Sequence, residues 1–204
     1  SNKGMPITEL QVQSALLFNN PLRVVTASHS VIKETFEAAL RGVGRGKGHF
    51  PQVSKEVFLE YDPEGAEQVP LVSDNKVIGI KKAGQRVKNL FINTKDIKGK
   101  KAVIKIVEDG KILTPDQKIT CATTFFLSRG GDGYFPGAVQ EIAVTPIARK
   151  HKGKVRHLTE QTAVKQYIRR LKKKKKWKEG KSYLDPDPKN AASFGRIIAK
   201  QPKS

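Results

Sequence analysis

The stretch from residue 125 to residue 134 constrains this chain more than any other. It reads Phe-Phe-Leu-Ser-Arg-Gly-Gly-Asp-Gly-Tyr and follows a strand-like run at residues 118–124. Side chains alternate between the two faces of a strand. The pattern therefore predicts Phe125 on the core face and Phe126 on the opposite face, among small neighbours. The three glycines permit a tight turn with positive φ and the close approach of a ligand.

This stretch has two interpretations. An exposed Phe126 ring and an Asp132 carboxylate that accepts hydrogen bonds from hydroxyl groups would suit a nucleobase with its sugar. The alternative is a core phenylalanine followed by a hairpin turn. The residues of the stretch are compatible with both.

Several segments together resemble the C-terminal domain of the 5'-nucleotidases, a family that includes UDP-sugar hydrolases and 2',3'-cyclic-nucleotide phosphodiesterases. Phe-Leu-x-x-Gly-Gly-Asp-Gly-Tyr resembles the signature of that domain. The other similar segments follow in the order of the family, at residues 6–8, 15–20, 30–37, 50–54, 61–65 and 194–197. The family usually has proline at the position of Leu17 and glycine at the positions of Asn19 and Lys55.

The resemblance implies an α+β fold with a mixed, mainly antiparallel sheet and flanking helices. It also implies a nucleotide-binding, substrate-specificity domain of a metal-dependent hydrolase that acts on nucleotide phosphate esters. Members of the family hydrolyse these esters at a two-metal centre in a separate N-terminal metallophosphatase domain. The resemblance further implies a periplasmic, secreted or cell-surface location.

The same resemblance implies a set of substrate-binding residues. Phe18 and Phe126 match the two rings that sandwich the base, so we expect them to lie roughly parallel and about 7 Å apart. Asp132 matches the carboxylate that binds ribose. The full set is Phe18, Phe126, Asp132, Asn20, Gly130 and Gly131.

The remaining sequence patterns agree with an α+β fold. Ser30 is predicted to cap a helix that ends near Gly42, and a second helix is predicted at residues 161–171. The glycine-rich stretch 42–48 lacks the Gly-Lys-Ser/Thr that opens a helix in a Walker loop, so it predicts a connector. Further strands are predicted at 22–26, 56–61, 76–80, 87–92, 102–107 and 196–199, with a hairpin turn at 109–110.

The sequence lacks the pattern of a catalytic centre. Its four histidines, His29, His49, His151 and His157, do not fall in the clusters of Asp, His and Asn that a two-metal site needs. The single cysteine, Cys121, excludes an internal disulfide and is predicted to be a buried, inert thiol. We therefore expect no cofactor in this chain and no activity from the chain alone. A divalent metal pair is expected in the N-terminal domain.

The length of 204 residues suits one domain. We expect residues 1–204 to form a single domain of the 5'-nucleotidase C-terminal type. The Asn-Gly-Gly-Gly-Ile-Arg segment of the family, which would precede residues 7–8, is missing. The sequence therefore predicts either a fragment without the first part of the domain and without the metallophosphatase domain, or a variant that has lost part of the pocket. Residues 169–190 are interpreted as a basic insertion that contains Asp-Pro repeats.

The net charge of +20 suggests an acidic partner. The lysine run between Lys172 and Lys178 is either a hydrated surface segment or a site of weak polyanion binding. The alternative function is thus a non-enzymatic binding protein of the same fold, with a polybasic surface for acidic ligands. No apolar run approaches the roughly 18 residues of a membrane span.

Overall fold

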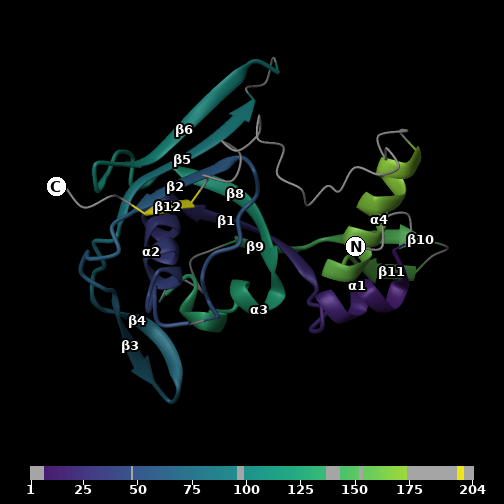
Figure 1. The fold of residues 1–204 in the computed structure, drawn as a ribbon, viewed down its shortest axis with the longest axis horizontal. Coiled ribbons are helices and arrows are strands. Elements are labelled where there is room, and N and C mark those ends of the chain that lie inside the picture. The colour runs from purple at the N-terminus through teal and green to yellow at the C-terminus, as the bar shows by residue number, and fades with distance from the viewer. Residues whose placement is uncertain are drawn as a thin grey trace.

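Two β-sheets share one hydrophobic core with helix α2, His29–Ala39 (Figure 1). The strand order is β12-β2-β5-β6-β7 in the larger sheet and β8-β1-β9 in the smaller one. All neighbouring strands are antiparallel except β12 and β2. The prediction of an α+β fold with a mixed, mainly antiparallel sheet is confirmed. The strands are β1 Leu22–Ser28, β2 Val57–Tyr61, β5 Val87–Lys95, β6 Lys101–Glu108, β7 Lys111–Ile112, β8 Lys118–Thr124, β9 Ala143–Pro146 and β12 Ile197–Ala199.

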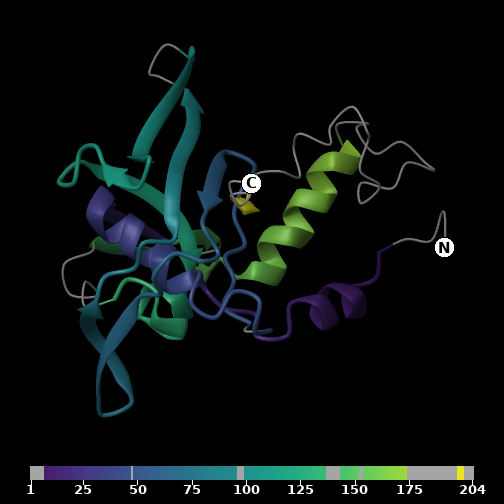
Figure 2. The same ribbon diagram turned by 60° about the vertical axis from the view of Figure 1, so that its left-hand side comes forward.

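The computed structural model describes residues 7–46, 48–95, 99–136, 143–151, 154–173 and 197–199. Within these ranges, smaller elements extend from the two sheets and α2. Helices α1, Glu9–Ala15, and α4, Glu160–Lys173, lie side by side at one end of the molecule (Figures 1 and 2). There Lys165 Nζ is 2.7 Å from Glu9 Oε1. The other elements are two hairpins and two short helical turns. In chain order, all of these are α1 Glu9–Ala15, β3 Val69–Ser73, β4 Lys76–Lys82, α3 Phe125–Ser128, η1 Gly131–Gly133, β10 Ala148–His151, β11 Lys154–His157 and α4 Glu160–Lys173.

Helix α2 follows strand β1 without a linking loop. Its N-cap is Ser28, whose Oγ accepts a hydrogen bond from the N–H of Val31. The prediction that Ser30 caps this helix is wrong, because the helix has already begun at His29; Ser30 Oγ donates to the carbonyl of Pro115 instead. The predicted apolar stripe does face the core, with Ile32, Phe36, Ala39 and Leu40.

A buried ionic group fastens α2 to the start of β5. The carboxylate of Glu37 is fully buried and accepts hydrogen bonds from the backbone N–H groups of Arg86, at 3.0 Å, and Val87, at 3.1 Å. Lys33 Nζ lies 3.2 Å from the same carboxylate. Arg86 adds a bond from its guanidinium to the carbonyl of Leu40. Since buried charges are stable only when they are paired and hydrogen-bonded, this group fixes the place of α2 on the sheet.

The outer parts of the chain match the sequence patterns less completely. The helix predicted at 161–171 is confirmed as α4, which extends to Lys173. Most of the lysine run to Lys178, most of the 169–190 insertion and residues 194–196 lie outside the described residues. None of the described helices is long and apolar enough to cross a membrane.

Candidate functional site

The candidate site begins where strand β8 ends. Thr124 Oγ1 accepts a hydrogen bond from the N–H of Leu127 and so caps the helical turn α3. The strand alternation stops there, so the prediction that Phe125 lies in the core is wrong. That ring is 37% exposed, with the guanidinium carbon of Arg23 4.8 Å from its centroid. Phe126 is 48% exposed, as predicted. The reason differs from the predicted one, because Phe126 belongs to a helical turn and not to a strand.

The glycine turn folds back against the Phe126 ring. Gly130 is left-handed, with φ of 88°. A Cβ atom on Gly131 would lie 2.5 Å from Cε1 of Phe126 and 2.6 Å from both Cδ1 and Cζ. Because three consecutive ring atoms are almost equidistant, this backbone lies over the face of the ring and not at its edge. One face of the ring is thus covered by the turn.

Asp132 is at the outside of this turn. Its residue is exposed and its backbone is left-handed, with φ of 55°. Among the described residues, its carboxylate forms no hydrogen bond and no ion pair. An ionised carboxylate accepts hydrogen bonds and donates none. Its lone pairs are therefore not used by another described residue.

Side chains from α2 and its following connector hold the turn in place. Arg41 Nη2 donates to the backbone carbonyl of Asp132 at 2.8 Å. Tyr134 Oη donates to the carbonyl of His49 at 3.1 Å. Burial, with the negative charge of Asp132 as a second cause, raises the pKa of Tyr134 to about 12. The tyrosine therefore keeps its proton, and the turn keeps this bond, across the physiological range.

The residue after Tyr134 is also held against its local preference. Phe135 is buried, and its φ of 49° is in the left-handed region. A bulky residue rarely adopts that conformation. The N–H of Phe135 donates to Thr35 Oγ1 at 3.2 Å, and its ring belongs to the hydrophobic core. Tertiary contacts with α2 thus fix the exit of the turn.

The segment with Phe18 reaches the same end of the smaller sheet. Helix α1 ends at Ala15, and the chain then turns at Asn19, whose φ is 45°. Asparagine tolerates this left-handed conformation better than most residues. Asn19, at a position where the family usually has glycine, therefore has a backbone conformation that glycine also adopts readily. Phe18 is 87% exposed.

Hydrogen bonds on both sides fix the path after Phe18. Asn20 exchanges two hydrogen bonds with Glu160, the first residue of α4: its N–H donates to the carboxylate at 2.8 Å, and its carbonyl accepts from the backbone N–H at 3.0 Å. The next carbonyl, of Pro21, accepts from the N–H of Phe125 at 2.7 Å. The segments that contain Phe18 and Phe126 are therefore joined by a hydrogen bond between Pro21 and Phe125. The stacking of the two rings about a base stays a prediction.

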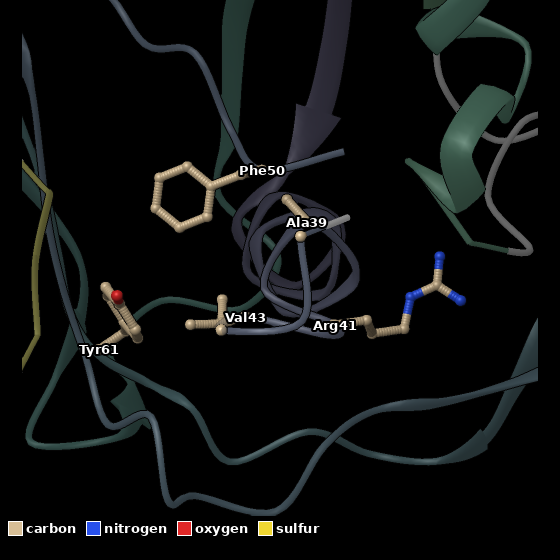
Figure 3. A pocket seen from close by; sticks show the side chains of 7 residues that line it. Ala39, Arg41, Val43, Phe50 and Tyr61 are labelled. Atoms are coloured by element: carbon tan, nitrogen blue, oxygen red, sulfur yellow. The ribbon is translucent and has the colours of Figure 1, made fainter. Parts of the chain in front are cut away.

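A separate hollow of about 320 Å³ lies on the other side of Arg41 (Figure 3). Figure 3 shows that the Arg41 side chain extends from the end of α2 away from the aromatic rings of this hollow. The other residues that line the hollow are largely apolar or glycine, and the Arg41 guanidinium lies on the Asp132 side, where it bonds to the Asp132 carbonyl. The lining residues are Ala39, Arg41, Val43, Gly44, Gly46, Phe50 and Tyr61.

The family model of the 5'-nucleotidase C-terminal domain matches residues 1–140. The chain belongs to this family. Among solved structures, the 5'-nucleotidase precursor from Thermus thermophilus is similar, with a TM-score of 0.55 and 20% identity over 97% of this chain and 29% of that one. The NAD nucleotidase of Haemophilus influenzae has a TM-score of 0.46 and 15% identity over 82% of this chain and 24% of its own.

This 5'-nucleotidase C-terminal domain thus spans less than a third of the length of those two proteins. No curated protein matches the chain. The similarity to the Thermus protein supports the fold, and the family match supports the identity of the domain.

Two histidines of this 5'-nucleotidase domain, His29 and His49, have separate hydrogen-bond partners. His29 is buried in the core, where its Nδ1 is 2.9 Å from Thr114 Oγ1, and burial lowers its pKa. His49 Nε2 bonds to the carbonyl of Arg41. In the part of the chain that the structure describes, no three His, Cys, Asp or Glu side chains gather to hold a metal ion. Cys121 packs against the core, and burial raises the pKa of its thiol.

Sequence reasoning missed Arg41, Thr35 and His49 as parts of the site. Each supports the turn through a bond to or from the backbone, and each lies 85 residues or more from its partner in the chain. Such contacts have no spacing that a sequence pattern could reveal. The only available signal was that Asp132, in a left-handed turn, needs outside support.

Proposed function

We propose that this domain binds the nucleoside part of a nucleotide for a metal-dependent hydrolase of the 5'-nucleotidase type, which acts on nucleotide phosphate esters. The proposal rests mainly on the exposed Phe126 ring, which Gly131 covers on one face, and on the exposed carboxylate of the next residue in the turn, Asp132. A base stacked on an aromatic side chain gains about 1–3 kcal/mol. The carboxylate accepts hydrogen bonds from ribose hydroxyls.

The second ring of the proposed site is Phe18. Its exposure and the adjacent path of its segment support a base between Phe18 and Phe126. Asn20 would orient this segment through its two bonds to Glu160, and Gly130 would allow the turn. This arrangement binds and positions the nucleoside but supplies no nucleophile for hydrolysis.

The chemistry is proposed to come from a partner domain. An N-terminal metallophosphatase domain of the full-length protein would hold a divalent metal pair, which activates water and stabilises the charge on the transferred phosphoryl group. This chain would contribute orientation of the substrate. Such a hydrolase would act in the periplasm, at the cell surface or outside the cell.

Calorimetric titration with adenosine tests the nucleoside site. We expect Phe126→Ala to weaken binding by about 5- to 150-fold, the equivalent of a lost stacking interaction. Phe125→Ala is the matched control, because the neighbouring ring lies against arginine side chains and is not assigned to the site. Equal affinities of the unmodified chain and Phe126→Ala would contradict the proposal.

A phosphate-release assay tests the proposal that hydrolysis takes place in the partner domain and not in this chain. The purified chain should release no phosphate from AMP above the blank when Mn²⁺, Zn²⁺ or Co²⁺ is added. Metal-dependent release that is lost on His49→Gln or His157→Gln would show a centre within this chain and would overturn that part of the proposal.

The alternative function, a non-enzymatic protein that binds acidic ligands, is supported by the charge of +20 and by the exposed Arg169 and Arg170 near the end of α4. We expect only weak, sequence-independent retention on heparin or DNA. It should end near about 0.3 M salt, where the Debye length is roughly 5–6 Å. Retention well above that concentration would favour the alternative.

A further inference from the structure

The backbone of Asp132 has an uncommon conformation. Its φ of 55° is left-handed, a region that aspartate enters more readily than most residues but less readily than glycine. Gly130 before it and Gly133 after it also have positive φ, and backbone hydrogen bonds from Gly133 to Gly130 and from Tyr134 to Gly131 close the turn. A contact from outside that holds the Asp132 peptide would also fix the direction of the Asp132 carboxylate.

Arg41 supplies such a contact. It follows the C-cap of α2, and its Nε donates to the carbonyl of Ala38 at 3.0 Å, which ties the guanidinium to the helix end. From there Nη2 donates to the carbonyl of Asp132 at 2.8 Å. A Cβ atom on Gly133 would lie only 2.2 Å from the same Nη2. The guanidinium thus fills the space under the turn and is anchored at both ends.

The guanidinium is also not committed to another carboxylate. Among the described residues, Arg41 has no ion pair, whereas Glu67 pairs with Arg45 and lies 3.8 Å from Arg86. The carboxylates whose charges act on Arg41 are those of Glu67 and Asp132. Its positive charge therefore lies beneath the turn whose exposed carboxylate would meet the ligand.

We propose that Arg41 is a positioning residue that sets the direction of the Asp132 carboxylate, and thereby the preference of the site for ribonucleosides over nucleosides without ribose hydroxyls. This inference rests on the proposed function, because it assumes that Asp132 binds ribose. Arg41 touches no ligand in this arrangement. It acts through the backbone of Asp132, whereas base stacking depends on Phe126.

The test compares three ligands by calorimetry: adenosine, 2',3'-dideoxyadenosine and adenine. For the unmodified chain we expect adenosine to bind about 10- to 150-fold more tightly than the dideoxy compound, the range for hydrogen bonds to a charged group. Arg41→Ala should reduce that ratio to about twofold or less and leave adenine binding unchanged. Arg41→Lys, which keeps the charge but can make only one of the two anchoring bonds, should give an intermediate ratio.

Arg45→Ala is the matched control. Arg45 is in the same connector and lines, with Arg41, a second hollow of about 560 Å³, but its guanidinium pairs with Glu67 and does not reach the turn. The ligand ratio should be unchanged in this variant. If Arg41→Ala does not fold, Arg41→Lys carries the test, with thermal unfolding as a check that it is folded.

The outcomes separate the two levels of the proposal. A chain that discriminates between adenosine and the dideoxy compound, with the ratio unchanged in Arg41→Ala and Arg41→Lys, would overturn the role of Arg41 and leave the ribose-binding role of Asp132 intact. Equal binding of both compounds to the unmodified chain would overturn both roles. A parallel loss of adenine affinity in the Arg41 variants would show a general structural role and would also overturn positioning.

Discussion

Gly131 lies over one face of the Phe126 ring, so closely that a methyl group there would be 2.5 Å from the ring. We expect Gly131→Ala to displace the ring and to destabilise the domain by about 1–3 kcal/mol, the usual cost of overpacking. Adenine binding should fall by about tenfold or more, as for the loss of a stacking partner. Gly48→Ala is the control, because a Cβ atom there meets nothing within 4 Å. Retained adenine affinity in Gly131→Ala would contradict the assigned role of the ring.

The buried carboxylate of Glu37 predicts a large effect on stability. Glu37→Ala leaves two backbone N–H groups without their acceptor and removes the fully buried one of the two carboxylates that pair with Lys33, the other being Glu34. We expect a loss of about 3–5 kcal/mol in the free energy of unfolding, measured by urea denaturation. Glu64→Gln, at an exposed position, should change it by less than about 0.5 kcal/mol. A loss below about 1 kcal/mol in Glu37→Ala would show that the network contributes little.

His29 predicts a pH dependence of folding. Its pKa is lowered in the folded state because the ring is buried, so the unfolded chain binds a proton that the folded chain does not. Stability should therefore be complete above the unfolded pKa of about 6.5 and should decrease as the pH falls below it. Urea midpoints at several pH values measure this slope. His29→Gln should reduce the slope, and His157→Gln, at an exposed position, should leave it as it is.

Tyr134 predicts a late step in an alkaline titration. With a folded pKa of about 12, its ionisation should appear as the highest component of the tyrosinate absorbance near 295 nm. Because the unfolded value is about 10, this residue stabilises the fold below that pH, and the contribution disappears as the pH rises toward 12. The component should vanish in Tyr134→Phe and persist in Tyr167→Phe. Its persistence in Tyr134→Phe would assign it to another group.

The sequence predicted the elements whose pattern is local. The apolar stripe of α2 and the alternation within β8 as far as Thr124 were read correctly, as was the hairpin at Asp109 and Gly110, which both have positive φ. The errors lie at junctions. Ser30 and Phe125 were misplaced because β1 and β8 each pass directly into a helix. The hydrophobic pattern of the sequence does not show at which residue the strand period of two gives way to the helix period of 3.6.

The site was predictable only in part. The position of Phe126 and Asp132 around a glycine turn came from a contiguous motif. Whether Phe18 stacks opposite Phe126 stays a prediction. The supporting residues, Arg41 and Thr35, are ordinary members of a helix and its end, and they reach the turn through bonds to backbone atoms that any residue could offer. Only the folded chain brings them together.

The left-handed backbone of Phe135 limits how far this motif can be moved. Such a conformation costs an L-residue roughly 1–2 kcal/mol, and here it is maintained by the core and by Thr35, 100 positions earlier in the chain. A synthetic peptide with residues 125–136, or a graft of these residues onto another scaffold, would lose that support and relax. Transfer of the proposed nucleoside site to a new protein would therefore require helix α2 and its connector as well as the glycine turn.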